Sequence, residues 1–395
     1  MNCMNSCQRS IVNYKKKIGG YTALGSGVYT PINVGVTSIY ALDEEHVYIG
    51  GTFTTANDIT ANQITMWNGK TNTFNALGGA LQKTDNGTCT IYAIYALDAE
   101  HVYIGGNFVT IGGITYNRIA MWNGNDFTAL GTSPNVGVGT INNDRVSVIH
   151  ALDAEHIYIG GTFNNTFGYY ITMYNQTNNT FTKLGTTILN SNVSAIYALD
   201  AEHIYIGGSF SNVNNSSIHY IVMYNQKTQT YTTLFADAYK SLSNTSYVTA
   251  IDALDAEHIY IGGFFSSIEG TKYNGIVMYN QNTKTFSALG TQPDVGVIDT
   301  FSNAYPYAIY ALDTEHIYIG GKFIKAGGIA INNITVWNQT TQSFTALGGG
   351  VGVNGNIVRA IYALNAEHLY IGGIFTSATN PTGNITVNNI TRWAG

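Results

Sequence analysis

The phrase Tyr-Ile-Gly-Gly occurs seven times in this sequence, and successive copies begin about 54 residues apart. Its tyrosines are Tyr48, Tyr103, Tyr158, Tyr205, Tyr260, Tyr318 and Tyr370. Repeats of this length are typical of solenoids, propellers and arrays, in which each unit buries its apolar surface against its neighbours. The repeat therefore constrains the fold more tightly than the length of 395 residues, which alone would allow two or three domains.

Each unit contains four short runs rich in Ile, Val, Tyr and Phe, separated by turn residues. In the fourth unit these runs span residues 193–200, 203–210, 220–225 and 230–234. They are apolar on both sides, as strands covered on both faces are, and no segment shows the spacing of a helix. The pattern predicts an all-β fold, a seven-bladed β-propeller of four-stranded antiparallel blades.

The two ends of the sequence complement each other. Six units carry an aromatic residue in the fourth run with Leu three positions later, and the seventh unit lacks this pair. The same pair, Tyr21 and Leu24, occurs near the N-terminus. We therefore expect an N-terminal strand to complete the last blade and close the ring, because closure leaves no strand edge unpaired. The predicted propeller spans residues 18–395, and residues 1–17 form a flexible tail.

The order of residues within one unit resembles the kelch repeat: a double Gly, then Tyr or Trp before Asn, then an aromatic residue seven positions on. In the fourth unit these are Gly207, Gly208, Tyr224, Asn225 and Tyr231. The resemblance covers residues 18–395 and includes the propeller domain of galactose oxidase. It implies a propeller that mostly serves as an interaction module, although the galactose-oxidase type is an enzyme, so the family leaves function open.

A copper site of the galactose-oxidase type requires a Cys cross-linked to Tyr, with further Tyr and His ligands. Cys89 is the only Cys within the repeats, and no His cluster accompanies it. Cys3 and Cys7 lie in the tail without a second Cys or His pair, so neither a disulfide framework nor a zinc site is expected. We therefore predict no cofactor and no metal.

Composition excludes several classes of partner. The net charge of −6 and pI near 5.8 do not favour nucleic acid, and no apolar run approaches the roughly 20 residues that span a bilayer. No secretory signal is recognisable, so we expect a soluble chain in the cytoplasm of a cell or host. The many Asn, Ile and Tyr residues suggest an AT-rich genome, and a component of a virus particle or of a host interaction is one hypothesis.

The two ends of each predicted blade differ in how much they vary. Turns one-to-two and three-to-four are nearly constant, whereas turns two-to-three and the links between blades vary in length. We call these ends the constant face and the variable face. A rigid scaffold with variable loops on one side is typical of a binding site, which predicts a non-catalytic module for protein–protein interaction.

The longest predicted variable loops span residues 132–144, 239–247, 293–306 and 377–388. Tyr239, Tyr247, Tyr305 and Tyr307 are the candidates in or beside them for contact with a partner. The alternative is that these tyrosines pack onto the blades.

The turn one-to-two always reads Asp/Asn-x-Glu-His, residue types that also build catalytic and metal sites. Seven equivalent copies offer no asymmetry between acid and base, and a first-position Asp or Asn accepts backbone N–H groups in a turn. A structural role is therefore expected. The alternative is an acidic rim for a basic partner or divalent cations, whose charge would fall as the pH drops through about 6.5. The first positions are Asp43, Asp98, Asp153, Asp200, Asp255, Asp313 and Asn365.

The repeat breaks at one position of the first run, where the usual Tyr becomes His150 in the third unit and Asp252 in the fifth. The first strand of a blade is expected to line the central channel. His150 and Asp252 are therefore candidate ligand-binding residues, with Arg145 or Arg359 at the strand entrances. The alternative is that each group only bonds to a neighbouring blade. The second hypothesis for the function of the chain, beside protein–protein interaction, is a glycan-binding or small-ligand-binding protein, or an enzyme, that uses the channel mouth around these residues.

Overall fold

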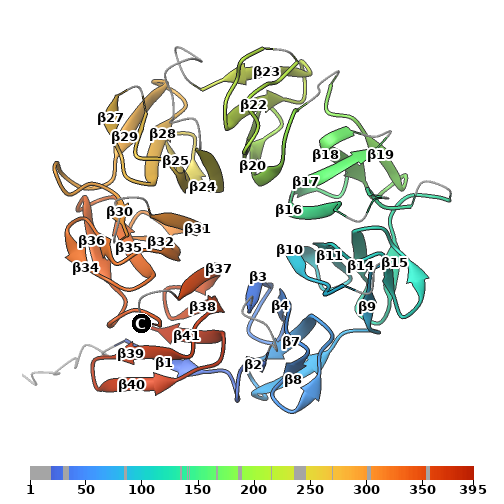
Figure 1. Cartoon of the computed structure of the whole chain (residues 1–395), viewed down its shortest axis with the longest axis horizontal. Helices are drawn as coiled ribbons and strands as arrows, with labels where there is room; N and C mark the ends of the chain where they lie inside the picture. Colours follow the sequence, from blue (N-terminus) through green and yellow to red (C-terminus); the bar gives the residue numbers. More distant parts are fainter. Residues whose placement is uncertain are drawn as a thin grey trace, which may run out of the picture.

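The computed structural model describes residues 19–29, 35–83, 87–133, 136–139, 141, 143–165, 168–185, 189–214, 216–234, 246–268, 270–299, 304–352 and 356–395. Every element in these residues is a strand, and the strands form seven four-stranded antiparallel sheets with several smaller ones. The seven sheets stand around a central axis as the blades of a propeller (Figure 1). The all-β, seven-bladed prediction is therefore confirmed.

The blades are numbered in chain order, and their strands are given from the innermost outwards. Blade one is β3 (Val36–Ala41), β4 (Val47–Gly51), β7 (Ile64–Asn68) and β8 (Thr73–Ala76); blade two is β10 (Ile91–Asp98), β11 (His101–Gly106), β14 (Ile119–Trp122) and β15 (Phe127–Ala129). Blade three is β16 (Arg145–Asp153), β17 (His156–Asn165), β18 (Gly168–Asn175) and β19 (Thr180–Thr182); blade four is β20 (Val193–Asp200), β21 (His203–Gly208), β22 (Ile221–Asn225) and β23 (Thr230–Thr233). Blade five is β24 (Tyr247–Asp255), β25 (His258–Phe264), β28 (Ile276–Asn280) and β29 (Thr285–Ala288); blade six is β31 (Tyr305–Asp313), β32 (His316–Lys322), β35 (Ile334–Asn338) and β36 (Ser343–Ala346). Blade seven is β37 (Ile357–Asn365), β38 (His368–Ile374), β41 (Ile390–Ala394) and β1 (Gly20–Ala23).

Strand β1 closes the ring as the outermost strand of blade seven. It pairs antiparallel with β41, with Tyr21 opposite Trp393. The two rings pack edge to face at 4.8 Å, and the Tyr21 hydroxyl donates to the Leu347 carbonyl oxygen of blade six at 2.8 Å. The predicted closure is confirmed, and the N-terminal strand contacts two blades.

The hydrophobic core lies between blades rather than within them. One cluster, for example, joins Tyr48 and Ile64 of blade one to Ile94 and Ile104 of blade two. The same arrangement recurs around the ring, so the apolar side chains on both faces of each strand are covered. Each blade is therefore stable only with its neighbours, as the repeat length predicted.

The double glycine has a steric explanation in both positions. A Cβ on Gly207 would lie 2.5 Å from a Val248 methyl carbon of blade five, and a Cβ on Gly208 would lie 2.1 Å from the Asn192 carbonyl oxygen. The first Gly therefore lets the next blade approach. The second makes room for the first strand of its own blade, which carries a β-bulge at this level.

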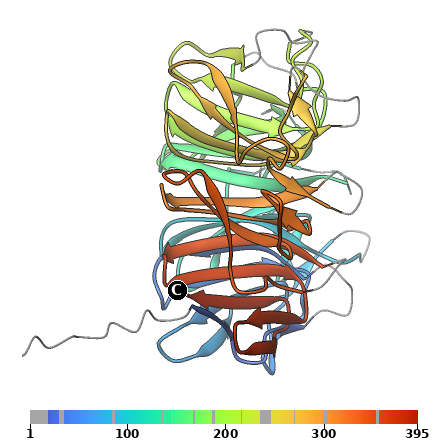
Figure 2. The same ribbon diagram turned by 90° about the vertical axis from the view of Figure 1, so that its left-hand side faces the viewer.

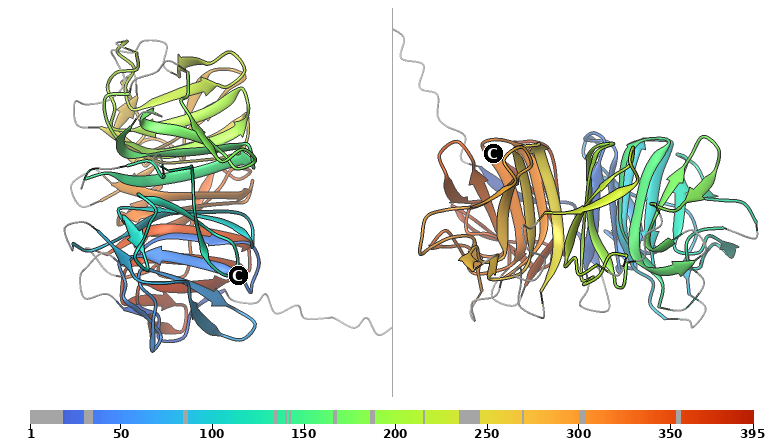
Figure 3. Two further views of the ribbon diagram at one scale, coloured as in Figure 1. Left: turned by 90° about the vertical axis from the view of Figure 1, so that its right-hand side faces the viewer. Right: turned by 90° about the horizontal axis from the view of Figure 1, so that it is seen from above.

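The two faces are clear when the ring is seen edge-on (Figures 2 and 3). Much of the variable face is itself β-structure: the connections between second and third strands form small hairpins, some of which pair with a strand of the preceding link. These elements are β2 (Val28–Tyr29) with β5 (Thr55–Ala56) and β6 (Ile59–Thr60); β9 (Leu81–Gln82) with β12 (Thr110–Ile111) and β13 (Ile114–Thr115); β26 (Ser267–Ile268) with β27 (Thr271–Lys272); β30 (Val297–Ile298) with β33 (Lys325–Ala326) and β34 (Ile329–Ala330); and β39 (Ser377–Asn380) with β40 (Gly383–Thr386).

Two loop predictions are corrected by these strands. Residues 377–388 contain the hairpin β39–β40 rather than an irregular loop, because pairing satisfies the backbone groups of a long surface segment. Tyr247 and Tyr305 begin the inner strands β24 and β31, and Tyr307 lies within β31, so none of the three lies in a loop. Tyr239, the tail 1–17 and parts of the other long loops lie outside the described residues. No helix in the described part of the chain is long and apolar enough to cross a membrane.

Candidate binding site at the mouth of the central channel

The position at which the repeat breaks forms a ring of side chains inside the channel, one from each innermost strand. Its members are Tyr40, Tyr95, His150, Tyr197, Asp252, Tyr310 and Tyr362. Successive rings lie 4.8–5.3 Å apart from Tyr310 through Tyr362, Tyr40, Tyr95 and His150 to Tyr197, and Asp252 occupies the remaining place. We call this set the channel ring.

His150 and Asp252 both bond to the next blade. The His150 Nδ1 accepts the Ala198 N–H at 3.4 Å, and the Asp252 carboxylate accepts the N–H groups of Ala253 and Ala311 at 2.9 and 2.8 Å. Tyrosines of the ring reach the next blade in another way, since Tyr95 donates its hydroxyl to a carbonyl oxygen there. The structure therefore shows the inter-blade bonds that the structural alternative required. It does not pair His150 with Asp252, because blade four, with Tyr197, lies between them.

Enclosure in the channel shifts both ionisable groups towards their neutral forms. Burial lowers the pKa of the His150 imidazole to about 4. Burial raises the pKa of the Asp252 carboxyl to about 7, although the N–H groups of Ala311 and Ala253 oppose the rise. At neutral pH the channel ring therefore holds a neutral imidazole and a carboxyl group near its midpoint of ionisation.

This shift predicts a pH-dependent stability that depends on Asp252. Because its pKa rises on folding from 3.8 to about 7, its contribution to stability is full below pH 3.8 and is lost as the pH rises through about 7. As the pH rises through this range, the wild type should therefore lose unfolding free energy relative to the Asp252→Asn variant, which has no titrating carboxyl group at this position. Urea unfolding at several pH values measures the difference, and carbon NMR of labelled Asp measures the pKa directly. A difference independent of pH, or an NMR pKa near 4, would contradict the prediction.

A second tier of channel-facing residues lies closer to the variable face. Each innermost strand carries a β-bulge at the same position, three residues before the channel ring. The bulged residues are Thr37, Tyr92, Ser147, Ser194, Thr249, Tyr307 and Arg359. All seven have a polar group, a regularity that is visible when the repeats are aligned, but only Tyr307 and Arg359 were among the predicted site residues. Bulges often redirect a side chain at functional sites.

The small bulged residues and the large ones have different roles. Ser194 donates its hydroxyl to the Val248 carbonyl oxygen of the next blade at 2.6 Å, and Thr37 and Thr249 make the equivalent bond. An opening of about 240 Å³ lies at the variable-face end of the channel, and all seven blades contribute to it. Tyr92, Tyr307 and Arg359 line it beside the smaller Thr37, Ser194 and Thr249. We call this opening the channel mouth.

Both candidate arginines lie at this level, each over a tyrosine of the preceding blade. The Arg359 guanidinium carbon is 5.4 Å from the centre of the Tyr307 ring, and that of Arg145 is 5.4 Å from the centre of the Tyr92 ring. The Arg145 Nε also donates to Ser147 Oγ at 3.3 Å. The buried Nε of Arg359 has no hydrogen-bond partner in the described residues. The arginines are thus separate from the channel ring rather than bonded to His150 or Asp252.

Three of the candidate partner-binding residues form an aromatic row with Phe264, and the last ring of the row, Tyr307, is the one that Arg359 contacts. Tyr247, Phe264, Tyr305 and Tyr307 follow one another with centre-to-centre distances of 5.6, 4.8 and 6.1 Å and interplanar angles of 21°, 18° and 11°. All four are half-buried, so part of each side chain reaches solvent at the rim. Phe264 was not predicted, yet it is the only aromatic residue that directly follows one of the seven Tyr-Ile-Gly-Gly phrases.

The constant face is built as the structural interpretation predicted. Asp200 Oδ1 accepts the N–H groups of Glu202 and His203 at 2.7 and 2.9 Å, and the His203 ring lies 2.9 Å from the carboxylate. In blade seven the side-chain oxygen of Asn365 takes the place of the aspartate and accepts the Glu367 N–H at 2.9 Å. There His368 also meets a carboxylate of blade one, Glu44, at 3.0 Å. The described residues contain no group of three or more His, Cys, Asp or Glu side chains that could hold a metal ion.

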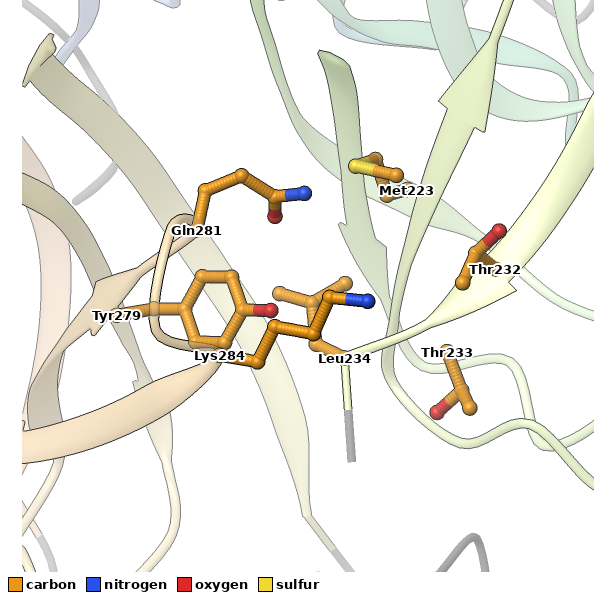
Figure 4. A pocket seen from close by; sticks show the side chains of 7 residues that line it. All are labelled: Met223, Thr232, Thr233, Leu234, Tyr279, Gln281 and Lys284. Atoms are coloured by element: carbon orange, nitrogen blue, oxygen red, sulfur yellow. The ribbon is translucent and has the colours of Figure 1, made fainter. Parts of the chain in front are cut away.

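A separate cavity of about 170 Å³ lies between blades four and five (Figure 4). Met223 and Leu234 of blade four and Tyr279 and Gln281 of blade five line it. Equivalent gaps occur between blades one and two and between blades six and seven. We therefore interpret this cavity as a packing feature of the repeat rather than as a ligand site.

Large apolar side chains with high exposure are distributed asymmetrically. Among the described residues they are Tyr29, Ile59, Ile114, Ile141, Tyr169 and Ile329. Five of the six lie in links or in connections between second and third strands, and Tyr169 lies at the start of β18, the third strand of blade three, beside such a connection, so all six lie on the variable face.

Comparison with known proteins supports the fold. Neither a protein-family model nor a curated protein sequence matches the chain. Among solved structures, YCF48 bound to D1 peptide has a TM-score of 0.51 at 9% identity, with 95% of this chain and 97% of that chain covered. The GH74 xyloglucanase from Xanthomonas campestris has a TM-score of 0.57 at 11% identity, with 94% and 56% covered.

The extracellular domain of a hybrid two component system from B. thetaiotaomicron has a TM-score of 0.57 at 13% identity. The match covers 95% of this chain but only 39% of that one. At such low identities these similarities show the fold alone. Together with the sheet topology, they establish that the chain is a β-propeller.

Proposed function

We propose that this propeller is a non-catalytic binding module that docks a partner protein on its variable face. The observation that carries the proposal is the position of the six exposed large apolar side chains, all on that face and none elsewhere in the described residues. Exposed apolar side chains that gather on one side of a soluble protein are typical of interaction surfaces.

Three of these side chains occupy equivalent positions at the hairpins. Ile59, Ile114 and Ile329 begin β6, β13 and β34 and have exposed fractions of 36%, 63% and 46%. They contribute little to the core, so stability does not explain their apolar character. Repetition of the same exposed residue type around the rim favours a broad contact surface over a single small-molecule pocket.

Two further observations support a partner of protein type. The kelch-like order of glycines and aromatic residues is typical of interaction propellers, and we propose that the repeats are of this type. YCF48, a structural neighbour, binds a peptide. The additional hypothesis of a virus-particle or host-interaction component rests on composition.

The geometry of the channel ring supports a non-catalytic role. His150 and Asp252 come from blades three and five and already accept backbone N–H groups. A general acid and base would need to face one common substrate position.

A glycan or small ligand at the channel mouth is the second candidate, because the aromatic row and Arg359 lie there. It is distinguished by its sensitivity to substitution. Binding of a glycan should be abolished by Tyr305→Ala and should not respond to substitution of the exposed isoleucines. Binding of a protein partner should be weakened by both kinds of substitution.

The test is affinity capture from the source organism, combined with cross-linking mass spectrometry. Replacing Ile114 and Ile329 by serine should abolish capture of the partner, because both side chains are exposed apolar contacts. The matched control replaces Lys70 and Lys227 of the constant face, whose side chains are 63% and 65% exposed. Capture that survives the isoleucine substitutions but fails in the lysine control would refute the variable-face assignment.

A further inference from the structure

We infer that the channel mouth binds a carboxylate of the partner, carried by an acidic peptide segment. This inference rests on the proposed function and assigns the chemistry of one contact within the variable face. It follows from the charge, the ring geometry and the size of the channel mouth.

The charge of the channel mouth differs from that of the protein as a whole. Arg359 is the only ionised side chain among the described residues that line it, and Arg145 lies beside it over Tyr92. No described carboxylate forms an ion pair with Arg359, and its buried Nε has no partner there. By contrast, 14 of the chain's 23 acidic residues belong to the turns of the constant face. A chain with a net charge of −6 therefore presents a cationic centre on the opposite face.

Asp252, the carboxyl group in the channel ring below, does not neutralise this centre. Its two oxygens accept the N–H groups of Ala253 and Ala311, one tier deeper than the bulged residues. Arg359 is thus available to an anion from outside, and its planar guanidinium suits a bidentate contact with a carboxylate.

The orientation of the aromatic row favours an anion over a sugar. Stacking on a sugar ring needs an aromatic face that is open to solvent. In the row from Tyr247 to Tyr307 the faces are turned towards one another, with interplanar angles of 11–21°. The edges, which carry the positive part of the ring quadrupole, are left for the ligand. The hydroxyls of Tyr247, Tyr305 and Tyr307 have no hydrogen-bond partner within the described part of the chain and add further donors.

The size of the opening fits a side chain. Its volume of about 240 Å³ lies below the range of about 300–1,000 Å³ that is usual for small-molecule sites. One acidic side chain of a segment lying across the rim can enter, while its neighbours contact the aromatic row and the exposed isoleucines.

The experiment measures fluorescence anisotropy of a labelled hexaglutamate peptide at low ionic strength, with hexaglutamine as the neutral probe. We expect hexaglutamate to bind and hexaglutamine not to bind. Arg359→Gln should weaken hexaglutamate binding by about tenfold or more, because a charge-assisted hydrogen bond is lost. Arg359→Lys should weaken it less, since the charge remains without the planar fork. Arg392→Gln, which removes an arginine from β41 of the same blade, is the matched control and should leave binding unchanged.

Equal binding of the two peptides, or equal effects of Arg359→Gln and Arg392→Gln, would overturn the inference. The inference would also be overturned if inorganic phosphate displaced the peptide at a lower concentration than free glutamate, because the site would then prefer a phosphate to a carboxylate. Capture of the partner protein distinguishes failure of the carboxylate assignment from failure of the proposed function. If the isoleucine variant loses the partner while Arg359→Gln retains it, only the carboxylate assignment fails; if both variants retain it, the variable-face proposal fails as well.

Discussion

Replacing Tyr21 by alanine should lower the free energy of unfolding by about 3–5 kcal/mol, the range seen when a large buried aromatic side chain is removed. Tyr21 is 3% exposed, packs edge to face against Trp393 and donates its hydroxyl to Leu347. Its strand, β1, also pairs with the outer edge of β41, which has no other neighbour among the described strands. The substitution therefore weakens the contact that joins the first and last parts of the chain.

Urea unfolding followed by tyrosine and tryptophan fluorescence measures this loss. Tyr29→Ala is the matched control, since Tyr29 lies eight positions further on and is 66% exposed. It should change stability by no more than about 0.5 kcal/mol. If the two variants lose similar amounts, β1 does not hold the ring closed.

The sequence predicted the blades well because each strand is specified locally. The four runs proposed for the fourth unit differ from β20, β21, β22 and β23 by at most two residues at any end. Alternation of apolar residues and fixed turn residues marks these boundaries in every copy. Closure was also predictable, because the missing aromatic–Leu pair of the last unit stands at the other end of the sequence.

The variable face was harder to predict because its segments differ in length from unit to unit. Residues 377–388 form a longer connection than those of the other units, and the short arms of their hairpin β39–β40 show no clear alternation of apolar and polar residues. Tyr247 and Tyr305 were assigned to loops because the innermost strands of blades five and six begin earlier than that of blade one, which starts at Val36. Their extension depends on pairing with the lengthened ends of β25 and β32.

The candidate site was located in part. The breaks at His150 and Asp252 indicated residues inside the channel, but the separation of these two side chains depends on the packing of blades three to five, which no local pattern encodes. The bulge that turns Arg359 and Tyr307 towards the channel mouth is a property of strand pairing, opposite the second glycine of each pair. Only the uniformly polar character of that position across seven units was visible beforehand.

Acid should destabilise the protein largely through the turns of the constant face. Burial alone would raise the pKa of the six turn aspartates, but hydrogen bonds from the following His ring and from backbone N–H groups lower it below its ordinary value of 3.8. A carboxylate whose pKa falls on folding stabilises the native state above its unfolded pKa. That contribution is lost as the pH falls through the folded pKa, so stability should fall below about pH 4.

Asn365 provides the variant that tests this interpretation, because blade seven already uses an uncharged amide in the same turn. Changing one, three and then all six turn aspartates to asparagine keeps the acceptor for the Glu N–H and removes the titrating group. The loss of unfolding free energy on acidification should become smaller with each replacement, and the steps should add because the turns belong to different blades. The measurement is urea unfolding at neutral pH and at about pH 3. An acid sensitivity unchanged in the sixfold variant would place the titrating groups elsewhere. A progressive decrease would instead show that the repeated Asp-x-Glu-His phrase stabilises the blades through its charge.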